Sequence, residues 1–231
     1  VVALATEQSV APLEAVADDA VVHPAPESFL VGEPTMALEA LEGNDRIEAR
    51  RRPPGPEEWG LYGRPTVVHT PRTLLQLRKL LAGEEFDPES ADPGTRLVSV
   101  RGAVAAPAVV ELRTDTALSR ALSAVETAGD RYVVGGQFGG VTDSLDVPVS
   151  APALSASGLG TEGNVEVLDS EDCIVATVGE RAAFAREKNC GSCVPCREGS
   201  KQLHETLRAV YDGEFDPDTL RALSRVMGKT S

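Results

Sequence analysis

Three cysteines in the run 190–196 constrain this chain more than any other feature of its sequence. Cys190, Cys193 and Cys196 follow a C-x2-C-x2-C pattern, so the fold has to bring three soft thiolates to one place. Iron–sulfur clusters are held by cysteine thiolates, and bacterial ferredoxins use the same spacing for three of their four ligands. Tetrahedral zinc sites more often use separated C-x2-C pairs or include histidines. The run therefore favours an iron–sulfur cluster over zinc or free thiols.

Cys173 is the only cysteine outside that run. A four-cysteine cluster needs one ligand beyond the clustered three, and Cys173 is one candidate for it. A lone cysteine can equally serve as a small buried hydrophobe with no such role. Because three of the four cysteines crowd one motif, the sequence contains no disulfide framework, and a reducing cytosol is the expected compartment.

The charge balance excludes one class of partner. The 231 residues include 36 acidic and 22 basic side chains, for a net charge of −14. So acidic a chain lacks the Lys/Arg surface that neutralises phosphates, and nucleic acid is not expected to bind. Strong acidity with few lysines fits a salt-adapted organism, in which net charge maintains solubility, or a GC-rich genome. No apolar run approaches the roughly 18–20 residues that span a bilayer, and no secretory signal is seen.

The first third of the sequence predicts short elements separated by irregular segments. A loose apolar stripe predicts a helix over 1–20, and prolines bound a short strand at 21–23. Helices are expected at 34–41, where a proline lies in the first turn, and at 72–82. The proline-rich run 50–56 predicts a loop. Its three successive arginines indicate a docking surface for a partner subunit, a region that steers an anionic nucleotide, or a solvated loop.

The remaining sequence predicts a small α+β unit followed by helices. The acidic stretch 84–95, with two Asp-Pro pairs, is interpreted as a linker. After it we expect the following elements: strands at 97–100, 108–112, 132–134 and 165–168, and a helix at 117–128. The glycine-rich run 135–140 fits neither G-x-G-x-x-G nor a P-loop and is interpreted as a turn. Apolar faces predict helices before and after the cysteines, and a further helix begins at Asp216-Pro217.

Three stretches resemble, in the correct order, the flavoprotein subunit of respiratory complex I, which has relatives among NAD-linked hydrogenases and formate dehydrogenases. Residues 169–173 and 190–199 resemble the iron–sulfur region of that family. The sequence from 98 to 140 resembles its β-grasp domain. Residues 32–43 and 60–68 resemble the end of its flavin-binding domain.

The resemblance implies an α+β, multi-domain fold. It assigns the parts as follows: the C-terminal part of an α/β flavin- and NADH-binding domain at 1–83, a linker at 84–95, a soluble-ligand-binding β-grasp domain at 96–168, and a truncated helical bundle that holds the iron–sulfur loop at 169–231. The implied chemistry is hydride transfer from NADH to FMN, followed by single-electron transfer to a [4Fe–4S] cluster. In such a protein the cofactors carry the chemistry, and no side chain is assigned as catalytic.

The resemblance also implies site residues and partners. The metal ligands would be Cys190, Cys193 and Cys196, and Cys173 would correspond to a non-ligand cysteine. The residues expected to border the flavin and nucleotide are Gly32, Glu33, His69 and Thr70. Arg197 is expected to place positive charge near the cluster. The implied partners are NADH and the other subunits of an NADH dehydrogenase-type complex, which would hold the chain at the cytoplasmic face of the cell membrane.

Several positions depart from that family. Pro34 stands where a second acidic residue is usual, and His69-Thr70 stands where two asparagines are usual. The glycine-rich FMN segment of the family lies upstream of the matched stretches, and the fourth cysteine ligand would follow a turn like 228–231. Because the chain begins with Val1, we expect a fragment, and because most of the flavin cradle of the family lies outside the matched stretches, we expect this fragment to show no NADH oxidation by itself. The alternative is a flavin-less paralogue that acts as an iron–sulfur electron-relay or assembly module. A structural zinc module is the third hypothesis.

Overall fold

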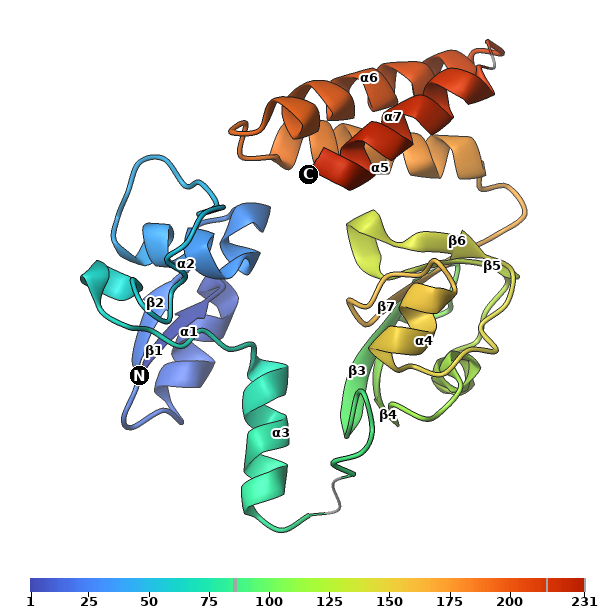
Figure 1. The fold of residues 1–231 in the computed structure, drawn as a ribbon. Coiled ribbons are helices and arrows are strands. Elements are labelled where there is room, and N and C mark those ends of the chain that lie inside the picture. Colours follow the sequence, from blue (N-terminus) through green and yellow to red (C-terminus); the bar gives the residue numbers. More distant parts are fainter. Residues whose placement is uncertain (85–86, 215, 231) are drawn as a thin grey trace. The chain divides into compact units, whose positions relative to one another are not determined.

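The computed structural model describes residues 1–84, 87–214 and 216–230. It is a mixed α+β fold with two sheets and a series of helices at the C-terminal end (Figure 1). The chain divides into two compact units. The first unit contains Val1–His69 and Ala182–Ser231, and the second contains Thr70–Arg181. The boundary between them falls inside one helix, α5 (Ile174–Lys188).

The first unit begins with a small β-α-β element. Strand β1 (Val2–Ala5) pairs in parallel with β2 (Val21–Pro24), and α1 (Glu7–Glu14) connects them. A helix connection of this kind is what parallel strands require. The prediction of a helix over 1–20 is therefore wrong at both ends. Its first residues form a strand because they pair in parallel with β2, which begins with the β-branched Val21 and Val22.

Helix α2 (Pro34–Leu41) confirms the prediction for this segment, and the 3-10 helix η1 (Phe29–Gly32) precedes it. Glu33 is the N-cap of α2, and the Glu33 carboxylate accepts a hydrogen bond from the Met36 N–H at 2.9 Å. Pro34 fits the first helical position because the N–H of that position has no partner inside a helix. Met36 and Leu38 are buried, which anchors this helix in the first unit.

Three helices complete the chain, as predicted. They are α5, α6 (Val194–Tyr211) and α7 (Pro217–Thr230). Helices α6 and α7 pack together, and Gly199 faces Met227 at their contact. A Cβ at position 199 would lie 2.9 Å from the Met227 Cγ, so glycine permits the close approach. Within the described residues, no helix combines the length and the apolar character that crossing a membrane requires.

A five-stranded mixed sheet forms the second unit, with the strand order β4-β3-β7-β5-β6. The strands are β3 (Thr95–Gly102), β4 (Ala108–Arg113), β5 (Arg131–Val134), β6 (Gly140–Thr142) and β7 (Asn164–Leu168). Strands β3 and β7 run parallel in the middle, and the other pairs are antiparallel. The four predicted strands are confirmed, whereas the three-residue β6 was not predicted.

The expected helix at 117–128 is instead the shorter 3-10 helix η3 (Leu118–Ala124). The backbone N–H groups of Leu118 and Ser119 donate to the carbonyls of Val147 and Leu145, at 2.8 and 2.9 Å. Long-range hydrogen bonds thus occupy donors at the start of the segment. Leu118 is buried in the core beside the sheet. The apolar spacing that predicted an α-helix therefore comes from residues that a 3-10 helix buries in this core.

The hydrophobic core of this unit lies between the sheet, η3 and α4 (Ala151–Ala156), which covers one face of the sheet in Figure 1. Its buried members are Val98, Val100, Leu118, Ala121, Val134, Leu145, Val149, Leu154, Leu159, Val165 and Val167. The alternation of buried residues along β3 and β7 is typical of strands with one buried face.

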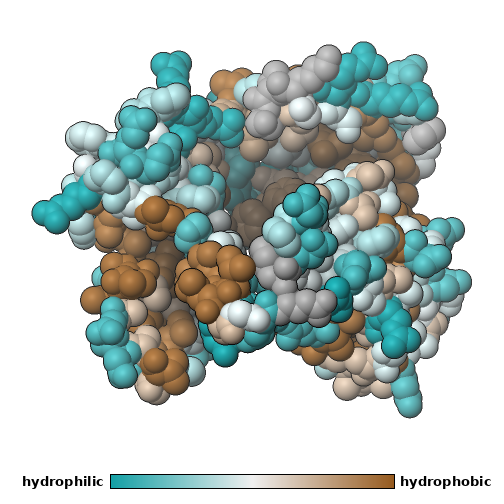
Figure 2. Space-filling view, turned by 60° about the horizontal axis from the view of Figure 1, so that its bottom comes forward, coloured by the Kyte–Doolittle hydropathy of each residue, from teal (hydrophilic) through white to brown (hydrophobic). Residues whose placement is uncertain are grey.

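Helix α3 (Pro71–Leu81) confirms the expected helix at 72–82. Thr70 is its N-cap, and Leu74, Leu77, Leu80 and Leu81 of this helix are exposed. Figure 2 shows that hydrophobic residues contribute patches to the surface beside hydrophilic ones. The segment interpreted as a linker follows α3. Residues 85 and 86 of that segment lie outside the described residues.

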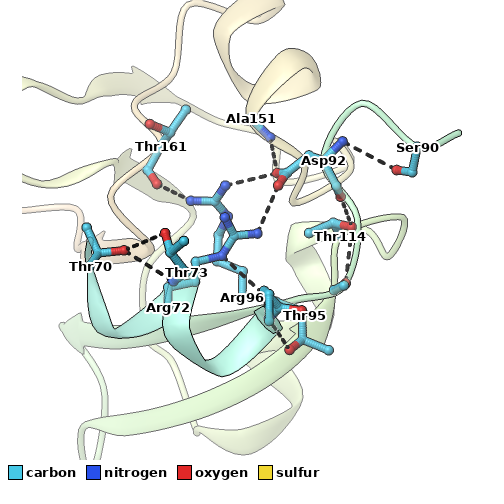
Figure 3. A network of polar contacts seen from close by, with 12 residues as sticks. Thr70, Arg72, Thr73, Ser90, Asp92, Thr95, Arg96, Thr114, Ala151 and Thr161 are labelled. Atoms are coloured by element: carbon cyan, nitrogen blue, oxygen red, sulfur yellow. Dashed lines mark hydrogen bonds and ion pairs between the residues drawn. The ribbon is translucent and has the colours of Figure 1, made fainter. Parts of the chain in front are cut away.

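Asp92, near the end of this segment, is buried in a polar network (Figure 3). Its carboxylate pairs with Arg72 of α3 at 2.8 Å and with Arg96 of β3 at 3.0 Å, and it accepts the Ala151 N–H at 2.8 Å. The Thr114 hydroxyl donates to the Asp92 carbonyl at 2.5 Å. One carboxylate therefore joins α3, β3 and α4.

Burial by itself would raise the pKa of Asp92, but the hydrogen bonds from Ala151, Arg72 and Arg96 outweigh it and hold this pKa below its usual range. A folded-state pKa below the unfolded-state value, about 3.9 for aspartate, means that the ionised carboxylate stabilises the fold. That contribution is fully present at pH values above the unfolded-state pKa. It is lost as the pH falls through the lower, folded-state pKa.

Replacing Gly135 with alanine should lower the free energy of unfolding of the second unit by at least ~2 kcal/mol. Gly135 has φ +94°, and a Cβ there would overlap the Cα of Gly160. The matched control is Gly158→Ala, because Gly158 has φ +69° with nothing within 4 Å of the added Cβ. This control should cost only the roughly 1 kcal/mol of the left-handed backbone. If urea titrations gave equal losses of unfolding free energy for the two variants, the close approach of Gly135 to the Gly160 backbone would be unimportant for stability.

Candidate iron–sulfur site

The cysteine loop connects α5 to α6, and Asn189 fixes its start. The Asn189 side-chain amide donates to the carbonyls of Ala185 and Arg186 at 3.0 and 2.8 Å, and its oxygen accepts the Gly191 N–H at 2.9 Å. Gly191 has φ +74°, a conformation that glycine adopts without strain. The end of α5 and the turn that follows it are therefore held by one side chain and one glycine.

The three clustered cysteines lie around the N-terminus of α6. Cys190 is in the loop, Cys193 is the N-cap, and Cys196 is in the first turn; all three are half-buried. The Cys193 side chain makes no capping hydrogen bond. Backbone N–H groups in a first helical turn lack intrahelical partners, and the positive end of the helix dipole attracts anions. This position thus suits a negatively charged ligand held by thiolates.

Cys196 is influenced by burial and by its charged and ionisable neighbours. Burial raises the pKa of Cys196, and the neighbouring Cys190 and Cys193 raise it further. The guanidinium of Arg51 opposes them and lowers this pKa. Since its surroundings disfavour ionisation of Cys196, a cationic metal centre is what would favour the thiolate form of this residue.

The thiols do not form a closed ligand shell in the described part of the chain. No group of three or more His, Cys, Asp or Glu side chains among the described residues could hold a metal ion as arranged. The three cysteines are neighbours at the start of α6 without forming such a group. Because a metal commonly completes its own site, the donor set is the better test of fit. Three soft thiols at a helix N-terminus fit an iron–sulfur cluster, and their assignment as ligands stays a prediction.

Arg197 supports the loop, and its charge is shared with a carboxylate. Its Nη1 donates to the Gly191 carbonyl at 2.5 Å, and its Nε donates to Glu198 at 3.0 Å. Arg197 in turn lowers the pKa of Glu198. The guanidinium thus connects the first turn of α6 to the cysteine loop and is ion-paired with Glu198, and its expected effect on a cluster stays a prediction.

A cavity that sequence reasoning missed adjoins the loop. It has a volume of about 680 Å³, and it is lined by Ala49, Arg50, Arg51, Arg52, Pro54, Trp59 and Ser192. Ser192 lies between two of the clustered cysteines in the sequence. The run of three arginines was the only signal of this site, and it did not indicate which part of the chain the arginines approach.

The residues expected at the flavin are found at helix starts and in exposed positions. Gly32 is exposed at the end of η1, and the carboxylate of Glu33 caps α2 and accepts the Thr35 hydroxyl at 2.6 Å. His69 is exposed and is the last residue of the N-terminal segment of the first unit, and Thr70 is the first residue of the second unit. The Thr70 hydroxyl accepts the Thr73 N–H at 3.3 Å. Glu33 and Thr70 therefore have capping roles, and a flavin contact of these four residues stays a prediction.

Cys173 differs from the other three cysteines. It is exposed just before α5, and its carbonyl accepts the Thr177 N–H at 2.9 Å. It belongs to the second unit, whereas the clustered cysteines belong to the first.

Comparisons with known proteins agree on one family. Residues 176–231, which include the three clustered cysteines, match the family described as NADH-ubiquinone oxidoreductase-F iron-sulfur binding region. The chain is 32% identical over 227 residues to the F subunit of NADH-quinone oxidoreductase from Mycobacterium tuberculosis (strain ATCC 25618 / H37Rv), covering 91% of this chain and 51% of that protein. It is 34% identical over 198 residues to the corresponding protein of Aquifex aeolicus (strain VF5), covering 81% and 45%.

A solved structure is similar as well. A chain in the crystal structure of NAD+-reducing [NiFe]-hydrogenase in the air-oxidized state superposes with a TM-score of 0.81 at 27% identity, covering 97% of this chain and 42% of that one. These proteins are named as oxidoreductases or their subunits. The chain spans about half the length of the curated relatives it matches.

Proposed function

The chain belongs to the family of the NADH-quinone oxidoreductase F subunit and its relatives, and we propose that it transfers electrons through a [4Fe–4S] cluster held by Cys190, Cys193 and Cys196. The observation that carries this proposal is the position of the three cysteines around the N-terminus of α6, inside the segment that matches the iron–sulfur region of the family. Relatedness to oxidoreductase subunits and the soft donor set support the same chemistry.

In this proposal the residues of the chain bind and orient, and a bound cluster supplies one-electron transfer. The three thiolates act as ligands, and the helix N-terminus of α6 stabilises negative charge beside them. Asn189, Gly191 and Arg197 hold the loop in place through the hydrogen bonds described above. The proposal does not assign the fourth ligand. Cys173 is a weak candidate because it lies outside the loop.

The finer proposal is that electrons come from NADH through FMN. It assigns 1–83 to the flavin- and NADH-binding domain, 96–168 to a β-grasp domain and 169–231 to the iron–sulfur domain. The mixed sheet supports the β-grasp assignment, because its first and last strands lie parallel in the centre and α4 covers one face. Partner subunits of an NADH dehydrogenase-type complex, and a cytoplasmic location beside the membrane, follow from the same proposal.

One observation favours the relay alternative. The carboxylate of Glu33 is occupied as the N-cap of α2, and Pro34 provides no second carboxylate beside it. A flavin-less relay module would keep the cysteine loop and need no contact to NADH. The two functions differ in what reduces the cluster.

The experiment compares two reductants on the anaerobically reconstituted chain. Dithionite should bleach the visible absorption of the cluster fully, because dithionite needs no nucleotide site. NADH with added FMN should leave the absorption unchanged, because the chain spans about half of its relatives. Bleaching by NADH would exclude the relay alternative and show that these residues provide the whole route. A cluster that dithionite cannot reduce would contradict electron transfer.

A further inference from the structure

Cys190 differs from the other two clustered cysteines in its backbone. Cys193 and Cys196 lie at the N-cap and in the first turn of α6, so this helix fixes their separation. Cys190 lies in neither helix, because α5 ends at Lys188 and α6 begins at Val194. Its thiol can join the other two at one cluster only if the loop itself holds the Cys190 backbone in place.

The side chain of Asn189 closes a turn around Cys190. Its oxygen accepts the Gly191 N–H at 2.9 Å, so the hydrogen-bonded ring encloses the Cys190 backbone. Its amide nitrogen donates to the carbonyls of Ala185 and Arg186 in the last turn of α5, where carbonyls have no partner inside the helix. One side chain therefore connects the Cys190 backbone to the end of a helix.

Gly191 is held from its other side by α6. The Arg197 Nη1 donates to the Gly191 carbonyl at 2.5 Å. Gly191 has φ +74° and nothing within 4 Å of an added Cβ, so glycine is needed there for the left-handed backbone and not for space. The two peptide groups that flank Gly191 are thus both bonded, one to Asn189 and the other to Arg197. None of these bonds uses a thiol, so they can form before a cluster is bound.

We infer that Asn189 is a positioning residue for the cluster, because it preforms the loop that presents the Cys190 thiol to the other two ligands. This inference rests on the proposed function. A ligand on mobile backbone has to be ordered when the cluster binds, and the lost conformational entropy weakens binding. With the Asn189 bonds in place, the backbone around Cys190 is already ordered, and the thiol side chains need only rotate. Asn189 does not bind iron and acts through Cys190.

The test compares the wild type with Asn189→Ala and Asn189→Ser. Both variants lose the amide that caps α5, but serine keeps a short side-chain oxygen that can accept the N–H two residues on. In the chain before reconstitution, the Gly191 N–H should exchange with solvent about fivefold or more faster in Asn189→Ala than in the wild type, because it loses its acceptor. In Asn189→Ser this N–H should stay protected.

The second readout is the decay of the visible cluster absorption when an iron chelator is added anaerobically to the reconstituted chain. Decay should be about tenfold faster in Asn189→Ala, since removing an outer-shell partner typically weakens metal binding by 10–100-fold. Asn189→Ser should decay at close to the wild-type rate. A general defect from the lost α5 cap would affect both variants alike, so the difference between them reports the loop bond.

Three results would overturn the inference. They are a cluster that Asn189→Ala retains as long as the wild type does, a cluster that Asn189→Ser loses as fast as Asn189→Ala does, and a Gly191 N–H that exchanges without protection in the wild type before reconstitution. Failure of the proposed function would look different. The wild type would then take up no iron and sulfide, although its Gly191 N–H would still be protected.

Discussion

Replacing Cys196 with serine is expected to lower the iron and acid-labile sulfide bound by the reconstituted chain by about tenfold or more. Even outer-shell changes alter metal affinity by about 10–100-fold, and Cys196 is proposed as a direct ligand. A serine hydroxyl is hard and protonated where a soft thiolate is required. Because Cys196 is half-buried in the first turn of α6, serine should fit without disturbing the helix. Iron and sulfide assays after anaerobic reconstitution measure the effect.

The matched control is Cys173→Ser, which makes the same replacement of sulfur by oxygen at a cysteine outside the loop. Cys173 is exposed and belongs to the other unit, so this variant should bind as much iron and sulfide as the wild type. Far-UV circular dichroism should be unchanged in both variants. Full cluster content in Cys196→Ser would contradict the ligand assignment. A loss in Cys173→Ser would instead identify Cys173 as the fourth ligand.

Replacing Asp92 with alanine should lower the free energy of unfolding of the second unit by about 3 kcal/mol or more, because removing one partner of a buried ion pair leaves a buried charge uncompensated. Arg96 is as buried as Asp92, with both side chains 9% exposed, so its guanidinium would lose its carboxylate without gaining water. The Ala151 N–H would lose its acceptor at the same time. Urea titration by circular dichroism, with hydrogen exchange at β3 and β7, measures the loss.

The control for Asp92 is Asp115→Ala, which removes an exposed partner of Arg113. Exposed pairs contribute little, and no measurable change is expected there. Acidification provides a second readout. Since the ionised Asp92 stabilises the fold only above its lowered pKa, the difference between wild type and Asp92→Ala should shrink as the pH falls below about 4. A difference that is small at neutral pH would show that the network is not important for stability.

The sequence predicts those features of the structure that arise from local patterns. The proline at the first helical position and the glycine after its end identify α2, and α3 and the helices that flank the cysteines follow from apolar periodicity. The hairpin of β3 and β4 follows from two β-branched runs with a short connection. The spacing of Cys190, Cys193 and Cys196 indicates the site without any structural information.

Long-range pairing accounts for what the sequence did not predict. Strand β1 exists because Val21 and its neighbours pair with it, and an Ala- and Val-rich run by itself equally suits a helix. Asp92 lies in a segment whose composition is typical of a linker. Its burial depends on Arg72 and Arg96, which approach it only in the folded chain. The approach of Arg51 to the cysteine loop likewise joins positions far apart in the sequence.

The most direct measurement is the ratio of iron to acid-labile sulfide in the wild-type chain after anaerobic reconstitution, together with its zinc content. The account predicts equal amounts of iron and sulfide, the visible absorption of an iron–sulfur protein, and little zinc. A folded chain that binds zinc in place of iron, that binds iron without sulfide, or that binds no metal at all would contradict the cluster on which the proposed function depends.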